Sequence, residues 1–159
     1  MSLLRNGPHD PALANITRPR GQNDNTPVLQ TAAEGNRLLV IDDQAGITRV
    51  VTLIATRMGI ETQSINLPNQ ALEAFLAFRP NIVILDMIMP EKDGIDVLNE
   101  LLLTGITAHM VLTSGFSENY LRLAEAVVKF HDNASCSVLR KPFRRHELVA
   151  ELSRHMVRA

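Results

Sequence analysis

Short apolar runs rich in β-branched residues alternate five times with segments of helical periodicity, from Arg37 to the C-terminus. The runs have the length of strands and the periodic segments the length of helices. Regular alternation of this kind is typical of a parallel sheet with helices between its strands. The expected strands are Arg37–Ile41, Ile60–Ile65, Asn81–Leu85, Met110–Thr113 and Ser137–Leu139. The pattern therefore predicts an α/β fold, a doubly wound (βα)5 chain with a five-stranded parallel sheet.

Apolar residues three or four positions apart mark the five expected helices, and helix-ending residues follow several of them. The helices are expected over residues 47–58, 71–78, 95–102, 120–128 and 148–156. Gly59, Pro80 and Gly105 come directly after, or shortly after, the first three. The first and third strands are apolar on both faces, which predicts that both are buried on both sides of the sheet.

The first 36 residues have a different composition. They contain four of the eight prolines, three of the eight glycines and five asparagines, with no sustained hydrophobic period. Such segments do not bury enough apolar surface to fold. We therefore expect a disordered N-terminal tail over residues 1–36, followed by a single domain over residues 37–159.

Charge, cysteine content and the length of the apolar runs limit the functions and locations that we expect for the chain. A net charge of −1 and a pI near 6.5 provide no long-range field to attract nucleic acid, so direct nucleic-acid binding is not expected. With one cysteine in the chain there is no internal disulfide, which favours a reducing compartment, and a cytoplasmic location is expected. Apolar runs such as residues 38–41 and 82–85 are far too short to span a membrane.

Polar and charged residues follow four of the expected strands. In an open parallel sheet the carboxyl ends of the strands form the ligand site, so these residues are predicted to meet in one pocket. They are Asp42 and Asp43 after the first strand, Asp86 after the third, Thr113 and Ser114 at the fourth, and Lys141 after the fifth.

The predicted pocket suits phosphoryl transfer. Three carboxylates brought together repel one another, and a divalent cation relieves that repulsion. Oxygen ligands without nearby cysteine or histidine favour Mg²⁺. A carboxylate such as Asp86 can attack a phosphoryl donor and form an aspartyl phosphate. The ammonium of Lys141 and the hydroxyl of Ser114 would each neutralise part of the oxygen charge.

At these residues, over about residues 36–157, the chain resembles the receiver domains of two-component response regulators. Asp42-Asp43 is similar to the family's acidic pair, and the stretch from Leu85 to Gly94 is similar to its phospho-acceptor loop. Lys141-Pro142-Phe143 is similar to its lysine motif. The stretch after Ser114 is also similar to receivers found ahead of cyclic-di-GMP phosphodiesterase domains.

The resemblance implies a flavodoxin-like strand order, 2-1-3-4-5, and a set of residue roles. Asp86 would accept the phosphoryl group, assisted by Ser114 and Lys141. Asp42, Asp43 and Asp86 would hold Mg²⁺ together with the backbone carbonyl of Ile88, and Asp43 is expected to contact the ion directly. The bond between Lys141 and Pro142 would be cis.

The resemblance also implies partners. The phosphoryl group would come from a histidine kinase or a phosphotransfer protein, or from a small phosphodonor. A downstream protein, not identified by the sequence, would read the signal, and a homodimer is compatible with the family. The chain would catalyse only its own phosphorylation and dephosphorylation.

Several alternatives stay open. Thr113 could supply the hydroxyl in place of Ser114, although Gly115 behind Ser114 is the small residue that the family has there. Val138 occupies the position of the family's aromatic switch residue, which leaves room for a protein-binding module that works without phosphorylation. A haloacid-dehalogenase-type phosphatase is disfavoured because Ile88 stands where its second carboxylate belongs.

The histidines show no metal-binding spacing along the chain. We therefore expect His109, His131, His146 and His155 to have solvent-exposed or capping roles.

Overall fold

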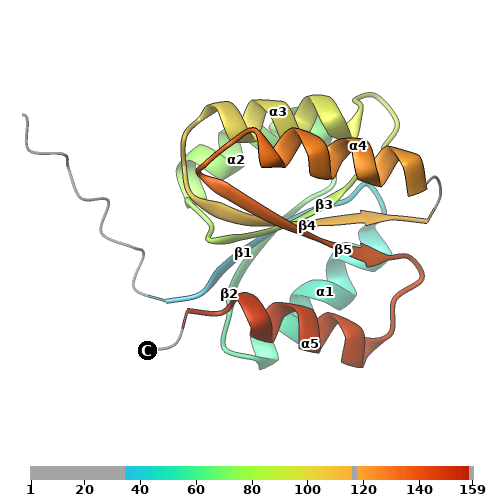
Figure 1. Cartoon of the computed structure of the whole chain (residues 1–159). Helices are drawn as coiled ribbons and strands as arrows, with labels where there is room; N and C mark the ends of the chain where they lie inside the picture. The colour runs from blue at the N-terminus through green and yellow to red at the C-terminus, as the bar shows by residue number, and fades with distance from the viewer. Residues whose placement is uncertain (1–34, 116–117, 158–159) are drawn as a thin grey trace, which may run out of the picture. The chain divides into compact units, whose positions relative to one another are not determined.

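Five parallel strands form one sheet, as the sequence pattern predicts, in the order β2-β1-β3-β4-β5 that the resemblance implies (Figure 1). The computed structural model describes residues 35–115 and 118–157. Apart from Gly35 and Asn36, the tail expected over residues 1–36 lies outside the described residues. The strands are β1 (Arg37–Ile41), β2 (Glu61–Ile65), β3 (Ile82–Asp86), β4 (Ala108–Ser114) and β5 (Ala134–Arg140). The helices are α1 (Ala45–Arg57), the 3-10 turn η1 (Pro68–Gln70), α2 (Ala71–Phe78), α3 (Gly94–Leu103), α4 (Glu118–Lys129) and α5 (Arg145–His155).

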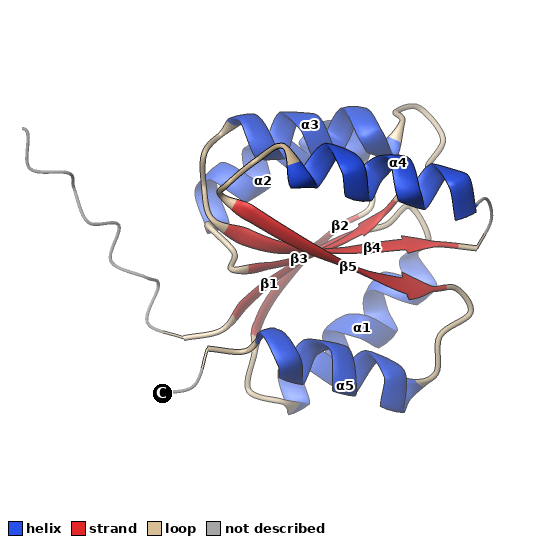
Figure 2. Cartoon of the chain, in the orientation of Figure 1, coloured by secondary structure: helices blue, strands red, loops and turns tan. Residues whose placement is uncertain are grey.

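The sheet lies between two layers of helices (Figure 2). Helices α2, α3 and α4 cover one face, while α1 and α5 cover the other (Figure 1). Side chains alternate between these faces along each strand, so neighbouring residues enter different cores. Leu39 and Leu85 pack into the core under α2, α3 and α4, whereas Val40 and Ile84 pack into the core under α1 and α5. Strands β1 and β3 are buried on both sides, as predicted.

Strands β4 and β5 are longer than predicted, and both begin earlier. The residues added at their beginnings include His109 and Ser135, which interrupt the apolar signal expected of a buried strand. These polar side chains hydrogen-bond one another: the two ring nitrogens of His109 lie 2.7 Å from Ser135 Oγ and 2.8 Å from Ser137 Oγ. Strand pairing therefore continues through a polar segment that the hydrophobic pattern alone excluded.

The expectation that His109 and His155 have solvent-exposed or capping roles is wrong. The side chain of His109 is 10% exposed, and its ring stacks on that of His155 with 3.3 Å between the centroids. The two residues are distant in sequence, and they meet because α5 packs across the first half of β4. His146, on the same helix, is exposed as expected.

The loop between β3 and α3 follows directly from its sequence. The side chain of Asp93 accepts a 2.8 Å hydrogen bond from Ile95 N and so caps α3. Gly94 is needed next, because a Cβ at this position would lie 2.5 Å from the Cα and the carbonyl oxygen of Met87. This close approach brings the start of α3 against the backbone that follows Asp86.

Asn36 joins the beginning of the described domain to its end. Its side-chain Nδ2 donates to Val157 O at 3.2 Å, and its side-chain Oδ1 accepts from Val157 N at 2.6 Å. The residue before β1 and the segment after α5 are therefore held together near the amino-terminal end of that strand. None of the described helices is long and apolar enough to cross a membrane.

Candidate functional site

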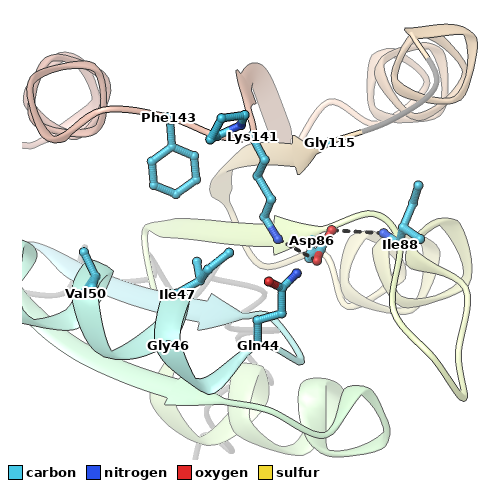
Figure 3. Close-up of a pocket in the computed structure, with 10 residues that line it drawn as sticks. Gln44, Gly46, Ile47, Val50, Asp86, Ile88, Gly115, Lys141 and Phe143 are labelled. Atoms are coloured by element: carbon cyan, nitrogen blue, oxygen red, sulfur yellow. Dashed lines mark hydrogen bonds and ion pairs between the residues drawn. The ribbon is translucent and has the colours of Figure 1, made fainter.

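An ion-pair cluster lies where β1, β3 and β5 end, at the carboxyl edge of the sheet. Lys141 Nζ lies 2.7 Å from Asp86 Oδ2 (Figure 3). The same nitrogen lies 2.6 Å from Asp42 Oδ2. The Asp42 side chain is fully buried and that of Lys141 is 11% exposed. The structure thus brings together three of the residues that the sequence placed in one pocket, although they come from different parts of the chain.

Asp43 completes an acidic cluster. Asp42, Asp43 and Asp86 each offer a carboxylate oxygen within 4.8 Å of the others. Three carboxylates face one ammonium, so two negative charges remain uncompensated when all are ionised. Among the described residues, the buried Oδ1 of Asp43 has no hydrogen-bond partner. A buried carboxylate oxygen without a partner is costly, and a hard cation such as Mg²⁺ would remove that cost. The donor set therefore fits the ion that the sequence implies.

Backbone amides orient two of these carboxylates. Gln44 N donates to Asp42 Oδ1 at 2.9 Å, and Ile88 N donates to Asp86 Oδ1 at 3.1 Å. Burial raises the pKa of Asp42, an effect that the hydrogen bond from Lys141 opposes. Asp86 is held from both sides, by Ile88 N on one oxygen and by Lys141 on the other.

The two candidate hydroxyls lie at the end of β4 in different environments. Thr113 is fully buried, and its hydroxyl donates to Leu85 O at 3.2 Å. Ser114 is the last residue of β4 and is also buried. Its carbonyl accepts a 3.1 Å hydrogen bond from Lys141 N, so the lysine backbone is joined to this strand end. The bond between Lys141 and Pro142 is cis, as the resemblance implied.

A cavity of about 510 Å³ opens beside Asp86 and Lys141 (Figure 3). Gln44, Ile47 and Val50 of α1 and its N-cap line one side of it, while Phe143 follows Lys141 on the other. Val50 is 53% exposed, so the wall formed by α1 is apolar and open to solvent. The acidic cluster therefore lies at one end of an accessible and partly apolar cavity.

Tyr120 makes a contact near the site that the sequence did not predict. It lies in the first turn of α4 and its hydroxyl donates to Asp93 Oδ1, the oxygen that caps α3. The contact connects the start of α4 to the loop that follows Asp86. Val138, which stands where the family has an aromatic residue, lies on β5 and is partly buried against the core under α4.

Titration of Tyr120 provides a direct check of this contact. Burial, and next the hydrogen bond to Asp93, raise the pKa of the phenol to about 12. Tyr120 is the only tyrosine and the chain has no tryptophan, so the near-ultraviolet absorbance reports this group alone. We expect the phenolate absorbance of the folded chain to have its midpoint near pH 12. The absorbance is recorded immediately after a rapid jump in pH, before the chain unfolds. In the urea-unfolded chain the midpoint should be about 10.

Two variants localise the cause of that shift. Asp93→Asn should lower the midpoint of the folded chain, because the charge that opposes the phenolate is lost. Asp132→Asn, an exposed carboxylate elsewhere, should leave the midpoint unchanged. A folded wild type that titrates near its unfolded midpoint would show that the Tyr120 hydroxyl does not contact Asp93 in solution.

A model of the response regulator receiver domain family matches residues 38–153 of the chain. The chain belongs to this family. The match confirms the predicted class: a receiver domain of a signalling protein rather than a conventional enzyme. The similarity to receivers that precede cyclic-di-GMP phosphodiesterase domains stays a prediction.

Several known proteins are similar to this chain in sequence or in fold. The DNA-binding response regulator MtrA of Mycolicibacterium paratuberculosis is 31% identical over 116 residues, 73% of this chain and 49% of that protein. The chain thus spans about half the length of this relative. The chemotaxis protein CheY4 of Vibrio cholerae superposes with a TM-score of 0.67 at 20% identity, over 76% of this chain and 98% of that one. The receiver domain of Francisella response regulator 1452 has a TM-score of 0.61 at 24% identity, over 74% and 93%. These two structures support the fold alone.

Proposed function

We propose that this receiver accepts a phosphoryl group on Asp86, in a reaction that uses Mg²⁺ bound by Asp42, Asp43, Asp86 and the backbone carbonyl of Ile88. The contact of Asp86 with Lys141 at 2.7 Å, beside an Asp43 oxygen that lacks a partner, is the observation that carries the proposal. A histidine kinase or a phosphotransfer protein would supply the phosphoryl group, since receiver domains take it from such donors. A downstream protein would read the phosphorylated state.

The residues divide the chemistry between them. An oxygen of Asp86 attacks the phosphorus atom of the donor, and the bond from phosphorus to the donor's leaving atom breaks. Lys141 exchanges part of its ion pair with Asp86 for a phosphoryl oxygen, so its charge stays paired throughout. Ile88 N holds the carboxylate in place by its 3.1 Å hydrogen bond. Mg²⁺, when bound, supplies the positive charge that the pocket lacks and that an anionic donor needs.

Ser114 is the better candidate for the hydroxyl that binds the phosphoryl group. The hydroxyl of Thr113 already donates to Leu85 O inside the core, and turning it toward a phosphoryl group would break that hydrogen bond. Ser114 lies one residue nearer the cavity, next to Gly115, which lines it. A hydrogen bond from Ser114 to the phosphoryl group would form only after transfer and would pull on the segment before α4.

The apolar wall of the cavity is the surface on which a donor protein would dock. Ile47 and Val50 on α1 and Phe143 before α5 surround the route to Asp86. A histidine side chain of the donor must enter that route to bring its phosphoryl group to the carboxylate. We further propose that residues 37–159 act as the receiver unit.

Phosphoryl uptake from acetyl phosphate tests the proposed function. With Mg²⁺ present, intact-mass measurement should show the addition of one phosphoryl group, which is then lost slowly as water attacks the acyl phosphate. With EDTA present, uptake should fall to background, because two carboxylate charges then remain uncompensated. A chain that takes up no phosphoryl group from acetyl phosphate or from any kinase, yet binds a partner, would instead be a phosphorylation-independent binding module.

Mg²⁺ binding should depend on Asp43 more than on Asp42. Asp43→Asn removes a carboxylate with an unpaired oxygen, whereas Asp42 already has a buried ion pair with Lys141. We expect Asp43→Asn to weaken Mg²⁺ binding by about tenfold or more, and Asp42→Asn to weaken it less. Isothermal titration calorimetry measures both, and Asp96→Asn, an exposed carboxylate of α3, serves as the control. Equal affinity in all four proteins would place the ion elsewhere.

A further inference from the structure

A second polar cluster lies far along the strands from Asp86. Strand β4 runs from Ala108 to Ser114, and His109 lies near its beginning, away from the edge that carries the acidic pocket. His109 meets Glu151 and His155 of α5, which are four residues apart and therefore on the same face of the helix. The proposed phosphoryl chemistry uses none of these three residues.

The cluster presents three donor atoms to one another. Glu151 Oε1 lies 3.1 Å from His155 Nε2 and 4.0 Å from His109 Nε2, and all three donors lie within 4.8 Å of one another. The Glu151 side chain is 6% exposed and that of His155 is 24% exposed. The two imidazole rings are stacked at an angle of 12°, so a shared ion requires the rings to turn away from each other about their side-chain bonds.

We propose that His109, Glu151 and His155 form a binding site for a divalent transition-metal ion, with Zn²⁺ as the representative ion. Zn²⁺ binds imidazole nitrogen and carboxylate oxygen at about 2.0–2.2 Å in tetrahedral geometry, which separates two such ligands by about 3.4 Å. The separations of 3.1 Å and 4.0 Å in the structure bracket that value. Two histidines and one carboxylate leave a fourth position for water, an arrangement that zinc sites use.

The surrounding residues support the ligands in a way that metal sites require. His109 Nδ1 lies 2.7 Å from Ser135 Oγ, so the ring proton can sit on Nδ1 while Nε2 binds the ion. Arg154 holds the other carboxylate oxygen, Glu151 Oε2, at 2.9 Å, and the hydroxyl of Ser137 donates to Oε1.

Without metal the same atoms form a hydrogen-bonded chain. Ser137 donates its proton to Glu151, so it must accept the 2.8 Å hydrogen bond from His109 Nε2. Metal binding therefore moves the His109 proton from Nε2 to Nδ1 and changes no net charge on the ring. Binding costs one hydrogen bond to Ser137 and the stacked arrangement of the two rings.

An ion can reach the cluster from solvent. His109, Ser135 and His155 line a cavity of about 430 Å³ that also reaches Asn81 and Val157. The cavity has room for the water at the fourth position. Mg²⁺ is a poor competitor here because it prefers oxygen ligands to imidazole. The acidic pocket, with oxygen ligands only, would thus bind Mg²⁺, and the cluster with two imidazole ligands would bind Zn²⁺.

A bound ion would join the beginning of β4 to the last turn of α5. The ion binds the folded chain and has no preformed site in the unfolded one, so it stabilises the fold. It would hold the end of α5 to the sheet without contacting the pocket around Asp86.

Zn²⁺ titration of the full chain without an affinity tag, in excess Mg²⁺, tests the site. The excess Mg²⁺ occupies the acidic pocket, so heat from added Zn²⁺ reports the histidine cluster. We expect one Zn²⁺ per chain, and a loss of affinity of about 100-fold or more in His109→Gln and in His155→Gln, because loss of an outer partner alone costs 10–100-fold. His146→Gln is the matched control, since His146 is an exposed histidine of the same helix.

The variants also separate binding from folding. His155→Gln changes a partly exposed residue at the end of α5, so this variant should fold even if His109→Gln does not. Circular dichroism without metal verifies that. Co²⁺ absorption should show tetrahedral nitrogen and oxygen ligation in the wild type and in His146→Gln, and not in His155→Gln. Unchanged Zn²⁺ affinity in folded His155→Gln, or an equal loss in His146→Gln, would overturn the proposed site.

Discussion

The Asp86→Asn variant is expected to take up no phosphoryl group from acetyl phosphate in Mg²⁺, whereas the wild type takes up one. The amide that replaces the carboxylate is not a nucleophile toward phosphorus. Neither Asp42 nor Asp43 occupies the position from which Asp86 would attack the donor. The remaining pocket keeps its shape, since Lys141 still pairs with Asp42 at 2.6 Å. Intact-mass measurement, followed by peptide mapping of the wild type, locates the modification.

Asp86→Asn should lose phosphoryl uptake without losing thermal stability. Removing one of three crowded carboxylates leaves one uncompensated negative charge in place of two, so the melting temperature should be equal to or above that of the wild type without Mg²⁺. Asp96→Asn, on the exposed side of α3, should keep full uptake. Phosphoryl uptake by Asp86→Asn at the wild-type level would refute the assignment of the acceptor.

Gly94→Ala is expected to be the most destabilising small change near the site, lowering the free energy of unfolding by about 3 kcal/mol. The added Cβ would lie 2.5 Å from two backbone atoms of Met87, and a backbone cannot rotate away as a side chain can. Met87 directly follows Asp86, so the displacement that relieves the clash should also slow phosphoryl uptake. Urea denaturation and the acetyl phosphate assay measure the two effects.

Gly46→Ala is the matched control for that substitution. Gly46 lies in α1, and a Cβ at this position meets nothing within 4 Å. Alanine has the higher helix propensity, so this variant should be more stable by about 0.5–1 kcal/mol. Equal and small effects of the two substitutions would show that α3 does not approach Met87 as closely as the structure has it.

The acidic pocket could be predicted because its residues lie at strand ends. In a parallel sheet the order of the strands brings these ends to one edge whatever the details of packing, so Asp42, Asp86 and Lys141 were expected to meet. The apolar runs of β1 and β3 revealed buried central strands for a similar reason. The hydrophobic pattern failed at the beginnings of β4 and β5, where His109 and Ser135 satisfy each other's polar groups and no longer need solvent.

Local periodicity and the motifs at the strand ends were thus enough to predict the α/β alternation, the parallel sheet, the family and the residues of the acidic pocket. Tertiary structure alone decided which distant side chains share a site elsewhere. His109, Glu151 and His155 have no recognisable spacing as a set, and they meet only because α5 packs across β4 and β5. Tyr120 reaches Asp93 for the same reason, through the docking of α4 beside α3. Contacts of this kind depend on how helices pack on a finished sheet, and no local pattern of residues records that packing.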